Sequence, residues 1–434
     1  MSVKTKISSY ISYGKRVAQT KEGKTLLSNF GWLTALQVAG YLFPLITIPY
    51  LARVIGVDGF GKIAFASAVI VWMQTIADWG FNFTATRDVA RNRDDIDKVS
   101  EIFSNVLWAR LLLLIVSYLV LIILIFAVPK FYEARAAIFA TSLMLIGHIL
   151  YPEWFFQAME RMKYITILGL TAKLVFTIAV FIFIHKPEDY ILQPLFISIG
   201  FVVSGIIALF FIFGRWGVKL KAPSFNAVLS TIKGSTDIFV NNLMPNLYNS
   251  FSTVLLGLYG NPVQNGLYDA GKKLPTIAWQ FIGVISRTFF PFLVRNDNKH
   301  SSFAKLYLSI AAVGSLLLFV LAKPLLLLFY TQDFMDAVPV MRLMSIILLF
   351  LAMNAVYGTN YLLIHNYDKL LRNITMVSSA IGFIIAFPLI KNYGFMGAAM
   401  TFTISTILLG ILPMIVALRI KKRVNNEETD KECN

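Results

Sequence analysis

Three charged side chains lie within long apolar runs of the sequence: Asp78, Lys173 and Arg287. A charge at the centre of a membrane span costs roughly 2.5–3.5 kcal/mol, and such residues usually face a cavity or a partner. In that setting a basic side chain can hold an anionic group such as a phosphate, and a carboxylate can pair with a base. The three residues are therefore the first candidates for a binding site.

The depth of each charge within its run separates these candidates. Lys173 is nine residues into its run, about 14 Å at 1.5 Å per residue and close to the middle of a bilayer. Asp78 and Arg287 are each seven residues from the cytoplasmic ends of equivalent runs, about 10 Å deep. We expect these two to pair and close the cytoplasmic side of a cavity. The alternative is that Asp78 caps a helix break near Gly80.

Lys323 and Arg342 lie near the outer ends of their runs. Their long side chains can reach the lipid headgroups from there, so an anchoring role is the simpler interpretation. In addition to this anchoring interpretation, Arg342 remains a candidate cavity residue.

The stretch DIFVNNLMPNLYNSFSTVLLGL carries Asn242, Asn246, Asn249 and Thr253 at i, i+4, i+7 and i+11, which is one face of a helix. Such a face must contact protein or water, because lipid offers no hydrogen bonds. Pro245 interrupts the backbone hydrogen bonds and predicts a bend. We interpret Asn242 and Asn246 as lining a wet path, with amide packing between helices as the alternative.

The sequence contains no recognisable catalytic arrangement. Its single cysteine, Cys433, excludes an intramolecular disulfide and a thiolate metal cluster. His148, Glu153 and His185 are too scattered for a metal site, and no phosphate-binding loop or Ser/His/Asp order is present. We therefore expect a protein that is not an enzyme, with no metal and no cofactor.

The composition predicts what positions these residues. Of the 434 residues, 57% are hydrophobic and 14% are charged, whereas soluble domains have about 25% charged residues. The sequence therefore predicts an all-α polytopic membrane protein with about twelve transmembrane helices. The expected spans are 28–52, 63–85, 106–128, 136–157, 164–185, 191–214, 236–258, 272–294, 306–329, 337–363, 371–390 and 394–418.

Basic residues gather on the loops that share a side with the amino terminus. The positive-inside rule then places both termini in the cytoplasm. The net charge of +16 has the same origin, so nucleic-acid binding is not expected. The first 27 residues have no cleavable signal pattern and are expected to form a basic arm on anionic membrane lipids.

Two stretches of the chain are similar to each other: PYLARVIGVDGFGKIAFASAVIVWMQTIADWGF and TVLLGLYGNPVQNGLYDAGKKLPTIAWQFIGVI. In each, one glycine ends a helix and a second opens the next, Gly56 and Gly61 in the first stretch and Gly260 and Gly266 in the other. The offset of about 204 residues is half of the membrane region. This pattern predicts two parallel repeats, with a chance similarity of the loops as the alternative.

The repeat predicts two six-helix lobes around a central cavity. The expected lobes are 28–230, with helices 1–6, and 231–420, with helices 7–12. A cytoplasmic arm at 1–27 and a cytoplasmic tail at 421–434 complete the chain.

With these segments in place, the chain resembles the polysaccharide flippases of the O-antigen (Wzx) type. They belong to the multidrug/oligosaccharidyl-lipid/polysaccharide (MOP) exporter superfamily. The resemblance is carried, in this order, by PYLARVIGVDGFGKIAFA, WGFNFTATRDVARNRDD, YPEWFFQAMERMKY, HKPEDY and LYDAGKKL.

The resemblance implies a function in the inner membrane of a Gram-negative cell. Such flippases move undecaprenyl-pyrophosphate-linked oligosaccharide from the cytoplasmic to the periplasmic leaflet by alternating access. The implied cavity is cationic. This agrees with the charges within the apolar runs, which comprise four basic residues and one acid, Asp78. Arg53 matches the place of functional arginines in related flippases. An O-antigen polymerase and a chain-length regulator are the implied protein partners.

Two other functions are compatible with a polytopic fold. A drug/cation antiporter of the same superfamily would need buried acids, and only Asp78 is clearly within a run. A membrane glycosyltransferase or polymerase would need a long outer loop with catalytic groups, and the outer loops here are short.

Overall fold

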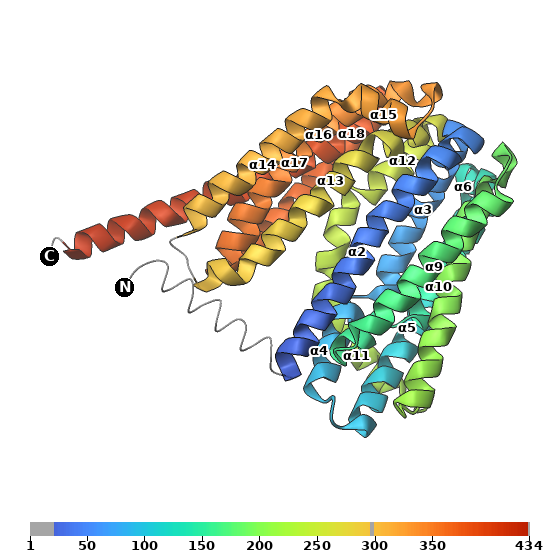
Figure 1. Cartoon of the computed structure of the whole chain (residues 1–434), viewed down its shortest axis with the longest axis horizontal. Coiled ribbons are helices and arrows are strands. Elements are labelled where there is room, and N and C mark those ends of the chain that lie inside the picture. Colours follow the sequence, from blue (N-terminus) through green and yellow to red (C-terminus); the bar gives the residue numbers. More distant parts are fainter. Residues whose placement is uncertain (1–20, 296–298, 433–434) are drawn as a thin grey trace.

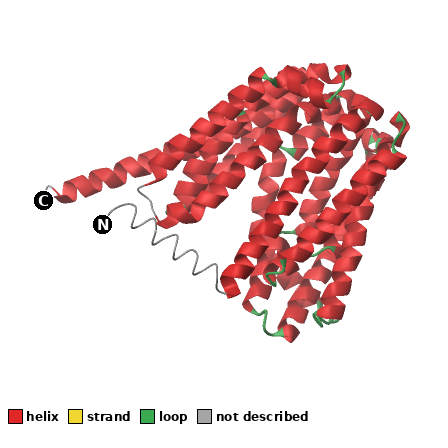
Figure 2. Cartoon of the chain, in the orientation of Figure 1, coloured by secondary structure: helices red, strands yellow, loops and turns green. Residues whose placement is uncertain are grey.

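The computed structural model describes residues 21–295 and 299–432, and every regular element within these ranges is helical (Figure 2). The predicted all-α fold is therefore confirmed. Most of the expected basic arm at 1–27 lies outside the described residues.

The first group of helices forms a bundle that we call the N-lobe. Its elements are α2 (Lys21–Val54), α3 (Gly56–Asp78), α4 (Phe81–Arg91), α5 (Ile96–Ala127), α6 (Pro129–Glu133), α7 (Arg135–Leu150), α8 (Glu153–Ala158), α9 (Met162–Phe183), η1 (Pro187–Ile191), α10 (Leu192–Phe210) and η2 (Phe211–Arg215).

A second group, which we call the C-lobe, follows after a connecting segment formed by α11 (Phe225–Leu243) and η3 (Met244–Leu247). The C-lobe elements are α12 (Ser250–Tyr259), α13 (Pro262–Arg295), α14 (His300–Val320), α15 (Ala322–Phe329), η5 (Gln332–Ala337), α16 (Val338–Ser345), α17 (Ile347–Met353), η6 (Asn354–Leu363) and α18 (Asp368–Glu432).

Ten of the described segments are long and apolar enough to cross a membrane. The segment Asp368–Arg423 contains two crossings, because α18 turns at Gly394, where φ is +53°. The expected span 236–258 is helical too, but η3 divides it into α11 and the short apolar helix α12 at Pro245, and we count the two together as one crossing. With these two included, residues 21–295 and 299–432 contain the twelve crossings that the apolar runs predict, and the chain is a multi-pass membrane protein.

The sequence explains where several helices begin and end. Asp95 caps α5, since its carboxylate accepts from the backbone N–H groups of Asp97 and Lys98. Pro262 is the first residue of α13, a position that lacks a backbone hydrogen bond in any helix. Gly56 begins α3 with a φ of +63°, which a residue with a Cβ rarely adopts.

Figure 1 shows the N-lobe helices, blue to green, beside the C-lobe helices, yellow to red. The two groups meet along α3, α12 and α13 and diverge toward the side where α2 begins and α18 ends. We call that side the terminal side. The opposite side, which carries the α2–α3 and α12–α13 connections, is the distal side.

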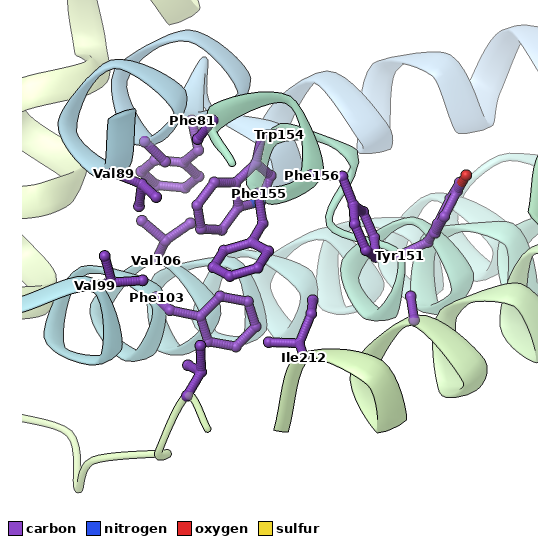
Figure 3. Packing of buried hydrophobic residues seen from close by; sticks show 14 of the residues in the cluster. Phe81, Val89, Val99, Phe103, Val106, Tyr151, Trp154, Phe155, Phe156 and Ile212 are labelled. Atoms are coloured by element: carbon purple, nitrogen blue, oxygen red, sulfur yellow. The ribbon is translucent and has the colours of Figure 1, made fainter. Parts of the chain in front are cut away.

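The terminal half of the N-lobe is held by an aromatic cluster (Figure 3). Phe155 and Phe156 of the short helix α8 are fully buried, and the ring of Phe155 lies 5.4 Å from that of Phe103 of α5. Each such side chain contributes about 1.5–3 kcal/mol through its burial in a soluble protein, and aromatic pairs add specific geometry in any solvent. The cluster fixes α4, α5 and α8 as one unit.

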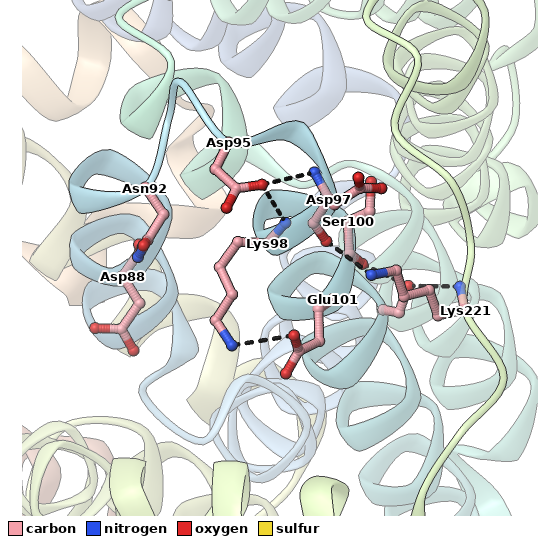
Figure 4. Close-up of polar contacts among 9 residues, drawn as sticks. Asp88, Asn92, Asp95, Asp97, Lys98, Ser100, Glu101 and Lys221 are labelled. Atoms are coloured by element: carbon pink, nitrogen blue, oxygen red, sulfur yellow. Dashed lines mark hydrogen bonds and ion pairs between the residues drawn. The ribbon is translucent and has the colours of Figure 1, made fainter.

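The segment before α11 contacts the first turns of α5 on the terminal side (Figure 4). Lys221 donates its backbone N–H to the Ser104 hydroxyl at 2.8 Å and its ammonium to the Asp97 carbonyl at 2.9 Å. These contacts tie the segment before α11 to the first turns of α5.

The connecting helix α11 packs against the N-lobe, whereas α12 packs most extensively against α18 of the C-lobe and also contacts α3 and α13. The Ser235 hydroxyl lies 2.8 Å from that of Thr84, and the Trp79 and Phe239 rings stack at 3.8 Å. The seventh crossing is therefore shared between the two groups and bends at Pro245 between them. The boundary between residues 230 and 231 stays a prediction.

Candidate functional site: polar cavities between the lobes

Residues of both lobes line a cavity of about 380 Å³, which we call the distal cavity. The N-lobe contributes Ser67 of α3 and Gln193 of α10, and the C-lobe contributes Thr253 of α12 and Lys272 of α13. The Gln193 side-chain oxygen is buried and has no hydrogen-bond partner among the described residues. The cavity thus presents hydroxyl, amide and ammonium groups inside the membrane region.

Lys272 is the cation at the centre of this site. Its ammonium donates to the Asn249 side-chain oxygen and lies 4.9 Å from the Phe402 ring centre and 5.3 Å from that of Tyr268. Aromatic faces attract a desolvated cation. The described residues give Lys272 no ion pair, since Asp269, one turn earlier, pairs with Lys273 at 3.9 Å. The three charged residues of the cavity therefore leave one positive charge in excess.

A second cavity of about 250 Å³, the terminal cavity, lies nearer the side where the chain ends. Its lining includes Thr75 and Asp78 of α3, Asn82 of α4 and Asn242 of α11. Val71 lines both the distal and the terminal cavities, so the two are neighbours along α3.

The partner of Asp78 is Arg110 of α5, so the expected pair with Arg287 is wrong in this structure. The Arg110 guanidinium donates to the Asp78 carboxylate and to the Asn82 side-chain oxygen, both at 2.8 Å. The Arg110 side chain is 3% exposed and that of Asp78 is 21% exposed. The two helices are neighbours within the N-lobe, whereas Arg287 is an exposed residue of α13.

The helix break expected near Gly80 is present, but the Asp78 carboxylate accepts from Arg110 and does not cap the next helix. Helix α3 ends at Asp78, Trp79 and Gly80 follow with φ of +42° and +82°, and α4 begins at Phe81. A Cβ on Gly80 would lie 2.7 Å from Ile238 of α11, so glycine is required for both its conformation and its space. The turn aims the Asp78 carboxylate at Arg110 and the Trp79 ring at α11.

Lys173 lines a third cavity, of about 340 Å³, whose lining residues all come from the N-lobe. Glu153 of α8 lines the same cavity, together with Tyr151, Gly169 and Ser204. The ammonium would lie 3.9 Å from a Cβ on Gly40 of α2, which places it between α2 and α9. Ile197 lines this cavity and the distal cavity, so the two adjoin.

Of the remaining predicted residues, Asn246 contacts α3, whereas Arg53 and Arg342 are exposed. Asn246 donates to the Thr75 hydroxyl at 2.9 Å, which joins η3 to α3. Arg53 and Arg342 are exposed, and the Arg342 guanidinium lies 5.7 Å from the Phe319 ring centre. These two arginines do not line the cavities between the lobes.

The predicted amide face does lie toward the lobe interface. Asn242 lines the terminal cavity, while Asn249 and Thr253 line the distal cavity. The bend at Pro245 turns the face from one cavity to the other. The sequence left amide packing and cavity lining as alternatives for this face. Both occur along residues 242–253, because Asn246 bonds α3 while the other members line cavities.

Sequence reasoning missed Arg110 and Lys272, because both lie near the start of an expected span. In the structure α5 begins at Ile96 and α13 at Pro262, so these residues are fourteen and ten residues into their helices. That corresponds to about 21 Å and 15 Å. The Asp95 cap and Pro262 at the first helical position are the signals that could have located them.

Two solved transporter structures share this arrangement of two helical lobes. The lipid II flippase MurJ in an inward closed conformation is similar with a TM-score of 0.69 at 13% identity, over 88% of this chain and 87% of MurJ. An inward-facing multidrug resistance MATE family transporter of the MOP superfamily is similar with a TM-score of 0.64 at 14% identity. The similarity covers 88% of this chain and 95% of that transporter. These likenesses show the two-lobed MOP fold.

The chain belongs to the polysaccharide biosynthesis protein family, whose model matches residues 26–297. A protein of Escherichia coli (strain K12), provisionally named an O-antigen transporter, is 27% identical over 385 residues, covering 87% of this chain and 93% of that protein. The succinoglycan biosynthesis transport protein ExoT of Rhizobium meliloti (strain 1021) is 24% identical over 355 residues, covering 75% of this chain and 67% of ExoT.

Proposed function

We propose that the protein moves undecaprenyl-pyrophosphate-linked oligosaccharide, an O-antigen unit, from the cytoplasmic to the periplasmic leaflet of a bacterial inner membrane. The movement occurs by alternating access and makes or breaks no covalent bond. The names of the relatives, which are transporters for O-antigen and succinoglycan biosynthesis, support a lipid-linked saccharide as the substrate class.

The observation that carries this proposal is the distal cavity with Lys272. A pyrophosphate carries about two negative charges, and an unpaired ion loses several kcal/mol of solvation when it leaves water. An ammonium without an acidic partner compensates part of that cost. Ser67, Gln193 and Thr253 beside it can bond sugar hydroxyls. We propose Lys173 and Arg287 as further contacts for the anionic group, and Arg53 and Arg342 as contacts at the distal end.

The acids near the cavities argue against a drug/cation antiporter. Asp78 is paired with Arg110, and Asp269 with Lys273. Glu153 shares its cavity with Lys173. A cationic drug would have to displace a basic residue from Asp78 or Asp269, whereas an anion meets Lys272 without such a competitor.

The proposed orientation places the terminal side in the cytoplasm. A reporter that is active only in the periplasm should be inactive when fused after Arg419 and active when inserted near Pro262, because basic residues follow the cytoplasmic side. The opposite pattern of activity would overturn the orientation.

Asn242 should take part in transport because its amide lines the terminal cavity. Asn242→Leu should reduce transport about tenfold, the effect of roughly one lost hydrogen bond to the substrate, with an unchanged amount of protein in the membrane. Asn241→Leu, on the adjacent face of α11, is the matched control and should be neutral. Equal activity of both variants would assign Asn242 to packing.

Deletion of the gene in its own host tests the proposed function. We expect loss of surface polysaccharide and accumulation of lipid-linked oligosaccharide in the inner membrane, both reversed by the wild-type gene. An O-antigen polymerase and a chain-length regulator would then act on the transported units. Normal surface polysaccharide together with a new sensitivity to cationic drugs would favour the antiporter instead.

A further inference from the structure

The two lobes touch through their backbones at one place on the distal side. A Cβ on Gly61 of α3 would lie 1.6 Å from the carbonyl oxygen of Pro262, and one on Gly266 of α13 would lie 2.2 Å from that of Val57. Real Cβ atoms do not approach oxygen this closely, so neither position accepts a side chain while the helices stay in place. We call this contact the glycine crossing.

The glycine crossing is reciprocal. Gly61 is the second glycine of the first sequence repeat and Gly266 is its counterpart in the second, and each contacts the start of the other helix. Among the described helices, α3 and α13 form the most extensive contact between the lobes. The repeat thus places one small residue from each lobe at the point where the lobes are closest.

Apolar side chains surround the glycine crossing on the distal side. The Phe60 ring of α3 lies 5.9 Å from that of Tyr330 and 5.6 Å from that of Phe334 in the C-lobe. Ile48 and Ala52 of α2 belong to the same buried cluster. Phe60 also lines the distal cavity, so this apolar layer adjoins that cavity.

One buried polar group lies at the closed contact, where it lines a cavity of about 100 Å³ together with Gly61 and Pro262. Asn265, one residue before Gly266, is 1% exposed, and both polar atoms of its side chain have no hydrogen-bond partner among the described residues. A buried amide without partners destabilises the state that buries it. Separation of α3 from α13 would expose this amide to bulk water. The close backbone contact therefore favours the closed state, whereas the Asn265 amide favours separation of the two helices.

We propose that the glycine crossing is the distal gate of the transporter, and that Gly61 and Gly266 set its equilibrium between closed and open. This inference rests on the proposed transport function, because a transporter must open the distal cavity to the distal side. With glycine at both positions, α3 and α13 can approach until their backbones are in contact. A methyl group at either position forces them apart and favours the open state.

Distances between spin labels test the gate without any substrate. The labels are placed at Glu188→Cys in the N-lobe and Gln332→Cys in the C-lobe, both exposed on the distal side, in a Cys433→Ser background in lipid nanodiscs. Gly61→Ala and Gly266→Ala should each raise the population with long distances by roughly ten- to a hundredfold, from the usual cost of overpacking a close contact.

Gly205→Ala is the matched control, because its Cβ would lie 2.5 Å from the Leu150 Cβ within the N-lobe. It should reduce the amount of folded protein and leave the label distances unchanged. Unchanged distances in folded Gly61→Ala and Gly266→Ala proteins would overturn the proposal.

A crosslink gives a second test that needs no glycine substitution. Phe60→Cys and Phe334→Cys, whose native rings are 5.6 Å apart, can be joined by a short bifunctional methanethiosulfonate. Transport should stop on crosslinking and return on reduction, and continued transport by the crosslinked protein would overturn the gate. The label distances do not depend on the substrate, so failure of the gate and failure of the proposed function are distinguishable.

Discussion

Lys272→Gln should reduce transport of lipid-linked oligosaccharide by at least tenfold, with wild-type amounts of protein in the membrane. The Lys272 ammonium faces a cavity lined by both lobes and has no ion pair among the described residues. A hydrogen bond to a charged group contributes about 1.5–3 kcal/mol, which corresponds to roughly 10–150-fold. Glutamine can still donate to Asn249, so the packing of α13 on α12 should persist.

Two further variants separate charge from structure at this position. Lys272→Arg keeps the positive charge and should retain part of the activity. Lys323→Gln removes a lysine that is exposed on α15 and should be neutral. Surface polysaccharide is measured in a strain that lacks the native gene, with protein abundance determined in the same cells. Normal polysaccharide in the Lys272→Gln strain would remove Lys272 from the transport path.

Arg110→Leu should strongly destabilise the N-lobe. The side chain is 3% exposed and holds Asp78, Asn82 and the His148 carbonyl together. Removal of one partner of a buried ion pair costs about 3–5 kcal/mol, because the other charge stays buried without compensation. We expect a large loss of folded protein, measured by thermal unfolding in detergent and by abundance in the membrane.

The double variant Asp78→Leu with Arg110→Leu is the control for this explanation. It removes both charges, so it should be more stable than Arg110→Leu alone. Asp78→Asn should be milder than Arg110→Leu, since Arg110 keeps its bond to Asn82. If the double variant is no more stable than Arg110→Leu, the loss comes from packing around α5 and not from an unpaired carboxylate.

The apolar runs were sufficient to predict the fold. A bilayer imposes one length on every crossing, so twelve runs predicted twelve crossings even where η3 divides one of them. The similarity of the two glycine-containing stretches predicted two lobes. It could not predict that Gly61 and Gly266 meet other elements at backbone distance, because a sequence repeat relates equivalent positions and does not state which of them are in contact.

The depths of the charged residues were predicted less well. A hydropathy run begins after the polar first turns of a helix, and for this reason Arg110 and Lys272 lie at the starts of their apolar runs although their helices begin much earlier. Asp78 was assigned a partner by equivalent depth. Its actual partner depends on how α3 and α5 are rotated toward each other, which the many possible packings of apolar helices leave open.

Transport by the purified protein tests the central claim most directly. The protein is reconstituted into liposomes with a fluorescent undecaprenyl-pyrophosphate-linked oligosaccharide, and a membrane-impermeant quencher reports the fraction in each leaflet. We predict that the wild-type protein, but not Lys272→Gln, moves the lipid between leaflets faster than protein-free vesicles do. Equal rates in wild-type and protein-free vesicles, together with uptake of organic cations by the same protein, would contradict a lipid-linked oligosaccharide flippase.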